Sequence, residues 1–100
     1  MPFAEQGDLL KVDGVAHPVF VVSNNFFNRS GKVIACPILR KAASGPLHIP
    51  IDNTVVEGIV ICEQVRYLDL SARHFTKLSQ AHYFETMDIS DAVMGIFEYM

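Results

Sequence analysis

The chain has 100 residues, half of them hydrophobic, and a formal net charge of −3. That length allows one small domain spanning residues 1–100, and the acidic balance argues against a general nucleic-acid-binding protein, which needs Lys and Arg for phosphate contacts. No apolar run approaches the ~18 residues of a membrane span, and the first ten residues lack a signal peptide's basic start, so we expect a cytoplasmic protein without a membrane partner. So much apolar surface on a small domain predicts a homodimer or another tight protein partner.

Two cysteines and an uneven charge distribution add further limits. Cys36 and Cys62 each lie inside an apolar run, without the spacing of a disulfide framework or metal site, so we expect reduced, buried thiols and no metal or other cofactor. Between Asp13 and Asp52 there is no acid, and from Asp52 onward the acids outnumber the bases. The bases of the acid-free segment either form a solvated face or mark a phosphate-facing edge; they are Arg29, Lys32, Arg40 and Lys41.

Short apolar runs separated by turn residues predict β-strands along the first three-quarters of the chain. Pro18 fits the first position of its strand, where a missing N–H is tolerated. The series predicts a mainly β fold, a small and strongly curved antiparallel sheet or barrel. We expect strands at 8–12, 18–23, 32–38 and 47–51, two strand-like pieces within 58–69, and a last strand at 74–79.

The segment NNFFNRSGK (24–32) links the second and third predicted strands. Its three asparagines favour turns and local caps, and we expect Phe26 and Phe27 to anchor the loop. Exposed Asn, Arg and Lys beside aromatic rings are also suited to contact nucleotides.

After Ser79 the alternation ends and apolar residues recur at helical spacing. We expect one helix somewhere within 80–98, packed on the sheet, with its apolar stripe in the core or in an interface. Ser79 or Ser90 would cap its start, and Asp88 and Asp91 would suit its first turn. The expected stripe is Tyr83, Met87, Val93, Ile96, Phe97 and Met100.

Four segments occur in an order that is found in one known family. The most specific is GIVICEQVRYLDLSARHFTKL (58–78), with QGDLLKV (6–12), HPVFVVSNNFFN (17–28) and VIACPI (33–38) before it. They resemble the MazF/PemK family of bacterial toxins, which typically has a Gly-Asp strand, an Arg-Pro strand with a Phe-Asn loop, a strand ending in Pro, and Asp-Gln-Val-Arg-x-Ile/Leu-Asp. The resemblance covers about residues 6–80. It implies a small SH3-like/CcdB-like antiparallel β-barrel with a C-terminal helix, forming a homodimer.

The resemblance also implies an activity. Such toxins usually act as metal-free, sequence-selective endoribonucleases on single-stranded RNA, and an antitoxin protein holds them inactive. Two positions depart from the family pattern. His17 stands where a catalytic Arg usually precedes the second-strand Pro, and Leu39 stands where a catalytic Thr usually follows the third-strand Pro. The first loop, DGVAHP (13–18), is also shorter than usual.

Metal-free RNA cleavage needs a base for the 2′-hydroxyl, an acid for the leaving oxygen and a cation for the phosphate. Histidine is the better proton shuttle at neutral pH, whereas arginine is a fixed charge with donors suited to phosphate. We therefore expect catalytic roles for His17, Arg40 and Glu63. The residues expected to bind the substrate, by lining or supporting the RNA groove, are Asn24, Asn28, Gln64 and Arg66.

Two alternatives stay open. A non-enzymatic or degenerate member of the fold would act by binding a protein, as the related gyrase-poisoning toxins do. The acidic second half, the apolar end VMGIFEYM and the missing Arg and Thr favour this reading. A barrel that serves only as an assembly scaffold would not be toxic at all.

Overall fold

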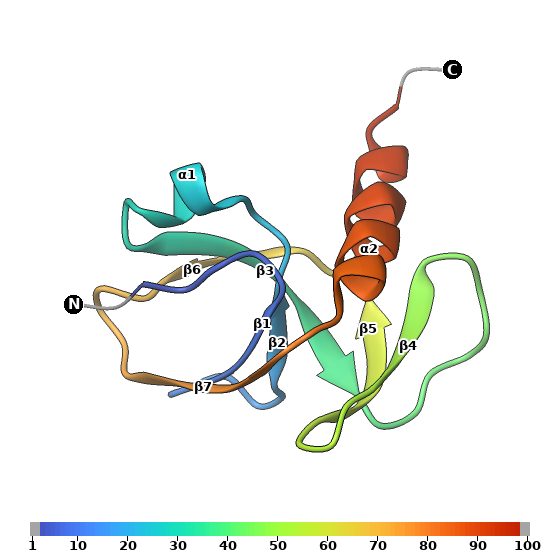
Figure 1. Cartoon of the computed structure of the whole chain (residues 1–100), viewed down its shortest axis with the longest axis horizontal. Helices are drawn as coiled ribbons and strands as arrows, with labels where there is room; N and C mark the ends of the chain where they lie inside the picture. The colour runs from blue at the N-terminus through green and yellow to red at the C-terminus, as the bar shows by residue number, and fades with distance from the viewer. Residues whose placement is uncertain (1–2, 99–100) are drawn as a thin grey trace.

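A computed structural model describes residues 3–98 as a sheet of seven strands with two helices (Figure 1). All the strands predicted from the sequence are present, and the segment 58–69 does contain two of them. The four-residue helix α1 lies in the segment that was expected to be a loop. The elements are β1 (Asp8–Val12), β2 (Val19–Val21), α1 (Asn25–Asn28), β3 (Lys32–Leu39), β4 (His48–Asp52), β5 (Glu57–Ile61), β6 (Arg66–Asp69), β7 (Phe75–Gln80) and α2 (Tyr83–Ile96).

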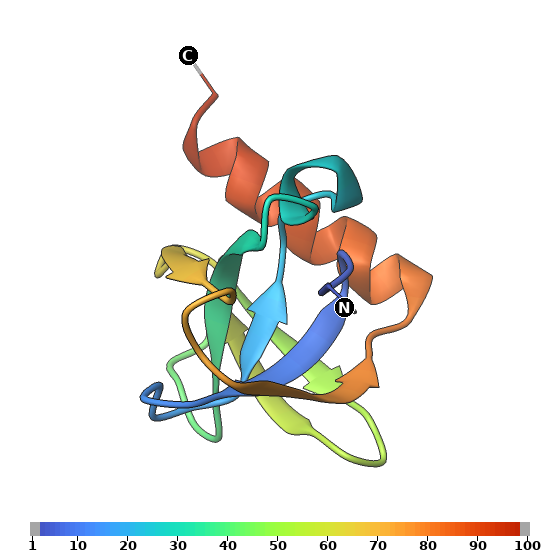
Figure 2. The same ribbon diagram turned by 90° about the vertical axis from the view of Figure 1, so that its left-hand side faces the viewer.

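The longest strand, β3, organises the sheet. Strands run antiparallel in the order β4-β5-β3-β2-β1-β7, and β6 pairs with β3 off this path. One edge of β3 pairs with β2; along the other, Lys32–Ala35 pair with β6 and Ile38–Leu39 pair with β5. The sheet curls into a half-barrel, with α2 lying across it (Figure 2). The predicted mainly β fold with a C-terminal helix is confirmed.

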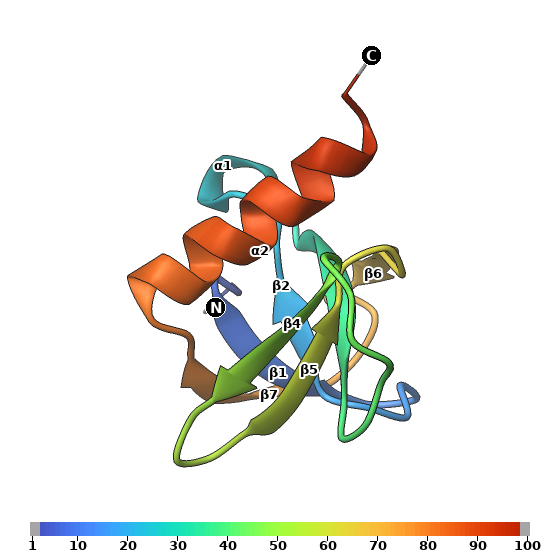
Figure 3. The ribbon, with the colours of Figure 1, turned by 90° about the vertical axis from the view of Figure 1, so that its right-hand side faces the viewer.

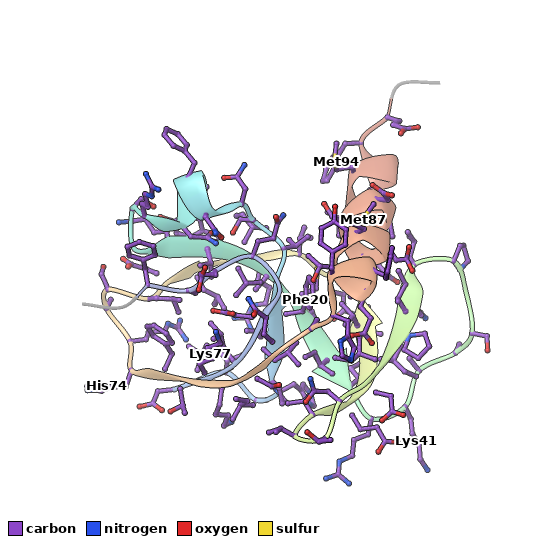
Figure 4. All side chains as sticks on the ribbon, in the orientation of Figure 1. Phe20, Lys41, His74, Lys77, Met87 and Met94 are labelled. Carbon is purple, nitrogen blue, oxygen red and sulfur yellow. The ribbon has the colours of Figure 1, made fainter. Side chains whose placement is uncertain are left out.

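Both faces of the curled sheet are buried, because successive residues of a strand point to opposite sides. One face closes on itself inside the half-barrel, and the other packs against α2 and the β4–β5 hairpin (Figure 3). Phe20 lies beside the lower end of α2 (Figure 4), and burying such a side chain contributes about 1.5–3 kcal/mol. The inner face includes Leu10, Val12, Val19, Val21, Val33 and Leu68, and the outer one Leu9, Phe20, Cys36, Ile38, Val60 and Ile89.

Helix α2 differs from the sequence-based expectation at its start, and little of its expected apolar stripe lies in the core. His82 is the N-cap, and its N–H donates to the Glu85 carboxylate at 3.0 Å. The predicted caps at serine and the predicted first-turn aspartates are therefore wrong. Ile89 and Val93 are buried, but Val93 alone among the described members of the expected stripe is in the core; Tyr83, Met87, Ile96 and Phe97 are exposed, and Met100 lies outside the described residues. Neither described helix is long and apolar enough to cross a membrane.

The connection between β2 and β3 is anchored by an amide. Phe26 is 84% exposed and Phe27 39%, whereas Asn28 is fully buried. Asn28 Nδ2 donates to the Ser23 carbonyl at 3.0 Å, Asn28 Oδ1 accepts from Ser23 Oγ at 2.5 Å, and Ser23 Oγ accepts from the Ile34 N–H at 2.9 Å. The expectation that the phenylalanines anchor this loop is wrong, because the buried polar backbone of a tight connection needs hydrogen-bond partners that a ring does not supply.

Candidate functional site

His17 and Arg40 lie at the same end of the sheet. The N–H of Ile38 donates to the Pro18 carbonyl at 2.8 Å, which places His17 beside the end of β3. That strand ends at Leu39, and Arg40 follows directly. Both His17 and Arg40 are exposed. The structure therefore brings together two of the three predicted catalytic residues. Continued by two residues from Val19–Pro37, the β2–β3 register puts Leu39, the other departure from the family pattern, opposite His17 and next to Arg40.

A surface groove of about 890 Å³ starts at this end and runs over β4 and β5. Arg40 and Lys41 form its basic rim, and Lys41 extends at the lower right of the molecule (Figure 4). Asp52, Glu57 and Glu85 also line it, so the groove carries both signs of charge. A nucleic-acid phosphate fits only the basic rim, since the carboxylates repel it. Glu57 was not among the predicted site residues. Its position in the groove depends on the pairing of β3 with β5, which joins residues about 20 positions apart in the chain.

Glu63 lies away from Arg40. Leu39 pairs with Ile59 in the β3–β5 ladder, and β5 then runs away from Arg40 to Ile61, where a turn carries Glu63. Glu63 instead stands at the end of β5, beside the start of β4. The predicted catalytic trio is thus divided between the two ends of β5.

The partner of Glu63 is His48. Glu63 Oε2 lies 2.8 Å from His48 Nε2, and His48 Nδ1 lies 2.6 Å from the Ala43 carbonyl oxygen. The hydrogen bond to Ala43, followed by that to Glu63, raises the pKa of His48 above its ordinary 6.5. The hydrogen bond from His48 also lowers the pKa of Glu63 below its usual 4.5. The pair therefore favours an imidazolium beside a carboxylate.

His48 was not among the predicted site residues. The sequence contained a usable signal, because a hairpin between the predicted strands at 47–51 and 58 onward puts residue 48 opposite 61. Glu63 is two residues further on, within reach of a side chain at 48. Without that pairing, His48 is one of several isolated histidines.

The four predicted substrate-binding residues lie toward the other end of β3 from Arg40. Asn24 caps α1 by accepting from the Phe27 N–H at 2.9 Å, and its surface is exposed. Asn28 is buried and fits the supporting role rather than the lining one. Gln64 and Arg66 are exposed in the β5–β6 connection and at the start of β6.

Cys36 and Cys62 are free and buried, as predicted. Burial, followed by the charges of Cys62 and Glu63, raises the pKa of Cys36 to about 12, and burial followed by the Glu63 charge raises that of Cys62 to about 11. Neither thiol is a nucleophile at neutral pH. Within residues 3–98, no three His, Cys, Asp or Glu side chains gather as ligands of a metal ion would.

Comparison with known proteins decides the family. Residues 7–97 match the model of the family described as PemK-like, MazF-like toxin of type II toxin–antitoxin system. The chain belongs to this MazF/PemK family. The match extends past the segments that carry the sequence resemblance and includes α2, so the helix is part of the toxin fold.

Solved structures agree with the MazF/PemK fold. A crystal structure of MazE–MazF from Deinococcus radiodurans superposes with a TM-score of 0.87 at 21% identity, over 96% of this chain and 97% of that one. An endoribonuclease in complex with its cognate antitoxin, from a mycobacterial species, gives 0.82 at 18% identity, over 97% and 99%. At such identities the superpositions establish the fold alone. No curated protein sequence matches the chain at a significant level.

Proposed function

We propose that this MazF/PemK toxin is an endoribonuclease that cleaves single-stranded RNA without a metal ion, acts in the cytoplasm and is inhibited by an antitoxin protein. The observation that carries the proposal is the placement of His17 and Arg40 together at the end of β3, in a chain of this family. The solved relatives that are bound to antitoxins support the proposed inhibitor.

In the proposed reaction, His17 takes the proton of a ribose 2′-hydroxyl. The 2′-oxygen then attacks the neighbouring phosphorus, a 2′,3′-cyclic phosphate forms, and the bond from phosphorus to the 5′-oxygen breaks. The 5′-oxygen takes a proton from solvent. Arg40 stabilises the charge that develops on the phosphate, with Lys41 beside it. This assignment uses one titratable group and one fixed charge and needs no hydroxyl at Leu39.

Glu63 is proposed to act on the same RNA strand, at the other end of β5. Asn24, Gln64 and Arg66 would bind the nucleotides beyond it, and Asn28 would support the loop that carries Asn24. An RNA strand that follows β5 would meet these groups after it leaves Arg40. On this arrangement, Glu63→Gln should weaken cleavage less than His17→Ala does.

RNA cleavage tests the proposal directly. Purified protein is incubated with a long unstructured RNA in EDTA, and new 2′,3′-cyclic phosphate ends are mapped. Replacing His17 with Ala should slow cleavage roughly 10²–10⁴-fold, the usual contribution of a general base. His74→Ala is the control, because His74 is exposed and lies far from Lys41 (Figure 4), and its contact with the 13–18 loop is made by its backbone carbonyl, which the substitution keeps. A wild-type chain that leaves the RNA intact would refute the proposed ribonuclease activity. Equal cleavage rates for the wild type and His17→Ala would exclude His17 as the general base.

A second copy of the chain is proposed to cover the exposed side of α2. Tyr83, Phe84, Met94 and Phe97 are each more than 60% exposed, and Met87 and Met94 project from the same side of the helix (Figure 4). Such a patch favours association. Met94→Glu should lower the mass measured by sedimentation, whereas Val55→Glu, at an exposed apolar residue of the β4–β5 turn, should not.

The alternative is a protein-binding toxin that does not cleave RNA. Leu39 brings no hydroxyl to the candidate site, and Glu63 stands at the far end of β5; both observations favour it. Growth arrest on expression with intact RNA, or with DNA breaks, would select this alternative. An absence of toxicity would select the remaining alternative, a barrel that serves only as an assembly scaffold.

A further inference from the structure

His48 connects two segments that the sheet itself leaves apart. Its Nδ1 is bonded to Ala43, in the loop formed by residues 40–47, and its Nε2 to Glu63, at the β5–β6 turn. Its backbone N–H also donates to the Gly45 carbonyl at 3.2 Å. One residue thus holds the middle of the loop to the end of β5.

Both side-chain partners of His48 are acceptors. A backbone carbonyl accepts only, and so does an ionised carboxylate, so each ring nitrogen must carry a proton to make both bonds. The geometry therefore requires the doubly protonated imidazolium. A neutral imidazole has one N–H and must give up one of the two contacts.

The loop that His48 holds begins with Arg40 and Lys41, the basic rim of the groove. Residues 43–46 are exposed and bury little apolar surface of their own, so their position depends on the few bonds that hold them. The same loop joins Arg40, at the end of β3, to the residue that His48 holds.

We infer that His48 is a positioning residue, a protonated clamp that fixes the 40–47 loop against Glu63 and so sets the place of Arg40 and Lys41. Its effect on RNA cleavage rests on the proposed function, whereas the clamp itself does not. His48 touches neither substrate nor phosphate in this role. The arrangement makes the position of the basic rim depend on pH.

The elements around His48 carry charges of both signs. Arg40 and Lys41 lie in the same loop, Asp52 at the far end of β4, Glu57 at the far end of β5 and Arg66 at the start of β6. Helix α2, which packs against β4, carries Glu85, Asp88 and Asp91. Apart from burial, which opposes it, the shift in the pKa of His48 comes from Ala43 and Glu63. The titration of the clamp is therefore set by these two contacts.

The direction of the pH dependence follows from the two shifts. The pKa of His48 is raised in the folded chain, so the clamp is complete below about 6.5 and is lost as the pH rises through the folded pKa. The pKa of Glu63 is lowered, so on the acid side the clamp lasts until the pH falls through that lowered value. The basic rim is held in place between these limits.

Trypsin provides a readout that does not need RNA, because it cuts after Arg40 and Lys41. His48→Ala should be cut at this loop roughly fivefold faster than the wild type near pH 6, where the clamp is complete, since proteolysis follows the population of the open loop. His48→Arg keeps donors and charge at every pH, and its fragments that end at Arg40 or Lys41, counted by mass spectrometry apart from any cut at the new site at position 48, should form slowly throughout. The wild type should move from the slow rate toward that of His48→Ala as the pH rises. His74→Ala should behave as the wild type, and Glu63→Gln should lower the His48 pKa measured by imidazole NMR.

The outcomes separate the clamp from the enzyme. Equal cutting of wild type and His48→Ala, or a His48 pKa unchanged in Glu63→Gln, would overturn the clamp whatever the RNA assay shows. If the clamp holds and the wild type cleaves RNA, kcat/KM should fall at high pH in the wild type but not in His48→Arg; a fall in both would overturn the positioning role. If the clamp holds and RNA stays intact, the proposed function fails and the clamp stands.

Discussion

Gly58 and Leu39 approach so closely that a Cβ at position 58 would lie 2.7 Å from the Leu39 carbonyl oxygen. The same Cβ would lie 2.8 Å from Ile38 Cγ2. This contact is where β5 joins the end of β3, directly beside Arg40. A glycine here lets the hairpin that lines the groove come against the strand that carries the candidate site.

Gly58→Ala is expected to destabilise the fold by about 1–3 kcal/mol, the usual cost of overpacking. The backbone atom it meets cannot move aside as the end of a flexible side chain could. Urea denaturation gives the free energy of unfolding. Gly45→Ala is the matched control, because a Cβ there would meet nothing within 4 Å; an equal loss in both variants would contradict the contact.

Asn28→Ala should lower the free energy of unfolding by about 1–3 kcal/mol, because it leaves the half-buried hydroxyl and carbonyl of Ser23 without their Asn28 partners. Asn24→Ala removes only an exposed cap of a single-turn helix and should cost less. Thermal unfolding of both variants tests the ranking. The reverse order would mean that the cap, and not the buried amide, anchors the α1 loop.

Lys77 is the partner of a buried carboxylate. Its Nζ lies 3.1 Å from Asp8 Oδ1, an oxygen that has no hydrogen bond with suitable geometry among residues 3–98, while Asp8 Oδ2 accepts from the Glu5 N–H at 2.8 Å. Lys77→Met should cost about 1 kcal/mol, less than a fully buried pair because Lys77 is 46% exposed. The cost should shrink in an Asp8→Asn background; a double-mutant cycle in urea measures this, and additive effects would refute the pairing.

The two cysteines should be inert in the folded chain. With pKa values of about 12 and 11, Cys36 and Cys62 stay protonated at pH 8 as well as buried. A thiol reagent such as Ellman's should react at the rate of unfolding in water and immediately in urea. In Cys62→Ser, Cys36 should likewise show no rapid labelling while the chain is folded, and rapid labelling of either thiol in the native state would contradict this burial.

The strands were predictable because their signal is local. Alternation and turn residues mark β1, β4 and β7 within one residue of their observed limits. The pairing was not predictable, since β3 meets β5 and β6 through residues far along the chain. For that reason the sequence pointed to His17 and Arg40 but not to their separation from Glu63. The exposure of the apolar stripe of α2 was unpredictable for a similar reason. Helical spacing shows that apolar residues share one face of the helix, and only the tertiary packing shows whether the sheet covers that face.

The sharing of β3 has a consequence for how the molecule opens. Its residues supply both cores: Val33 and Ala35 belong to one, Cys36 and Ile38 to the other. Neither core can unfold while β3 stays paired with its neighbouring strands, and neither can stay folded once β3 is displaced. We expect heat to unfold the chain in one transition, and the amides of β3 to exchange with deuterium only when the whole molecule opens.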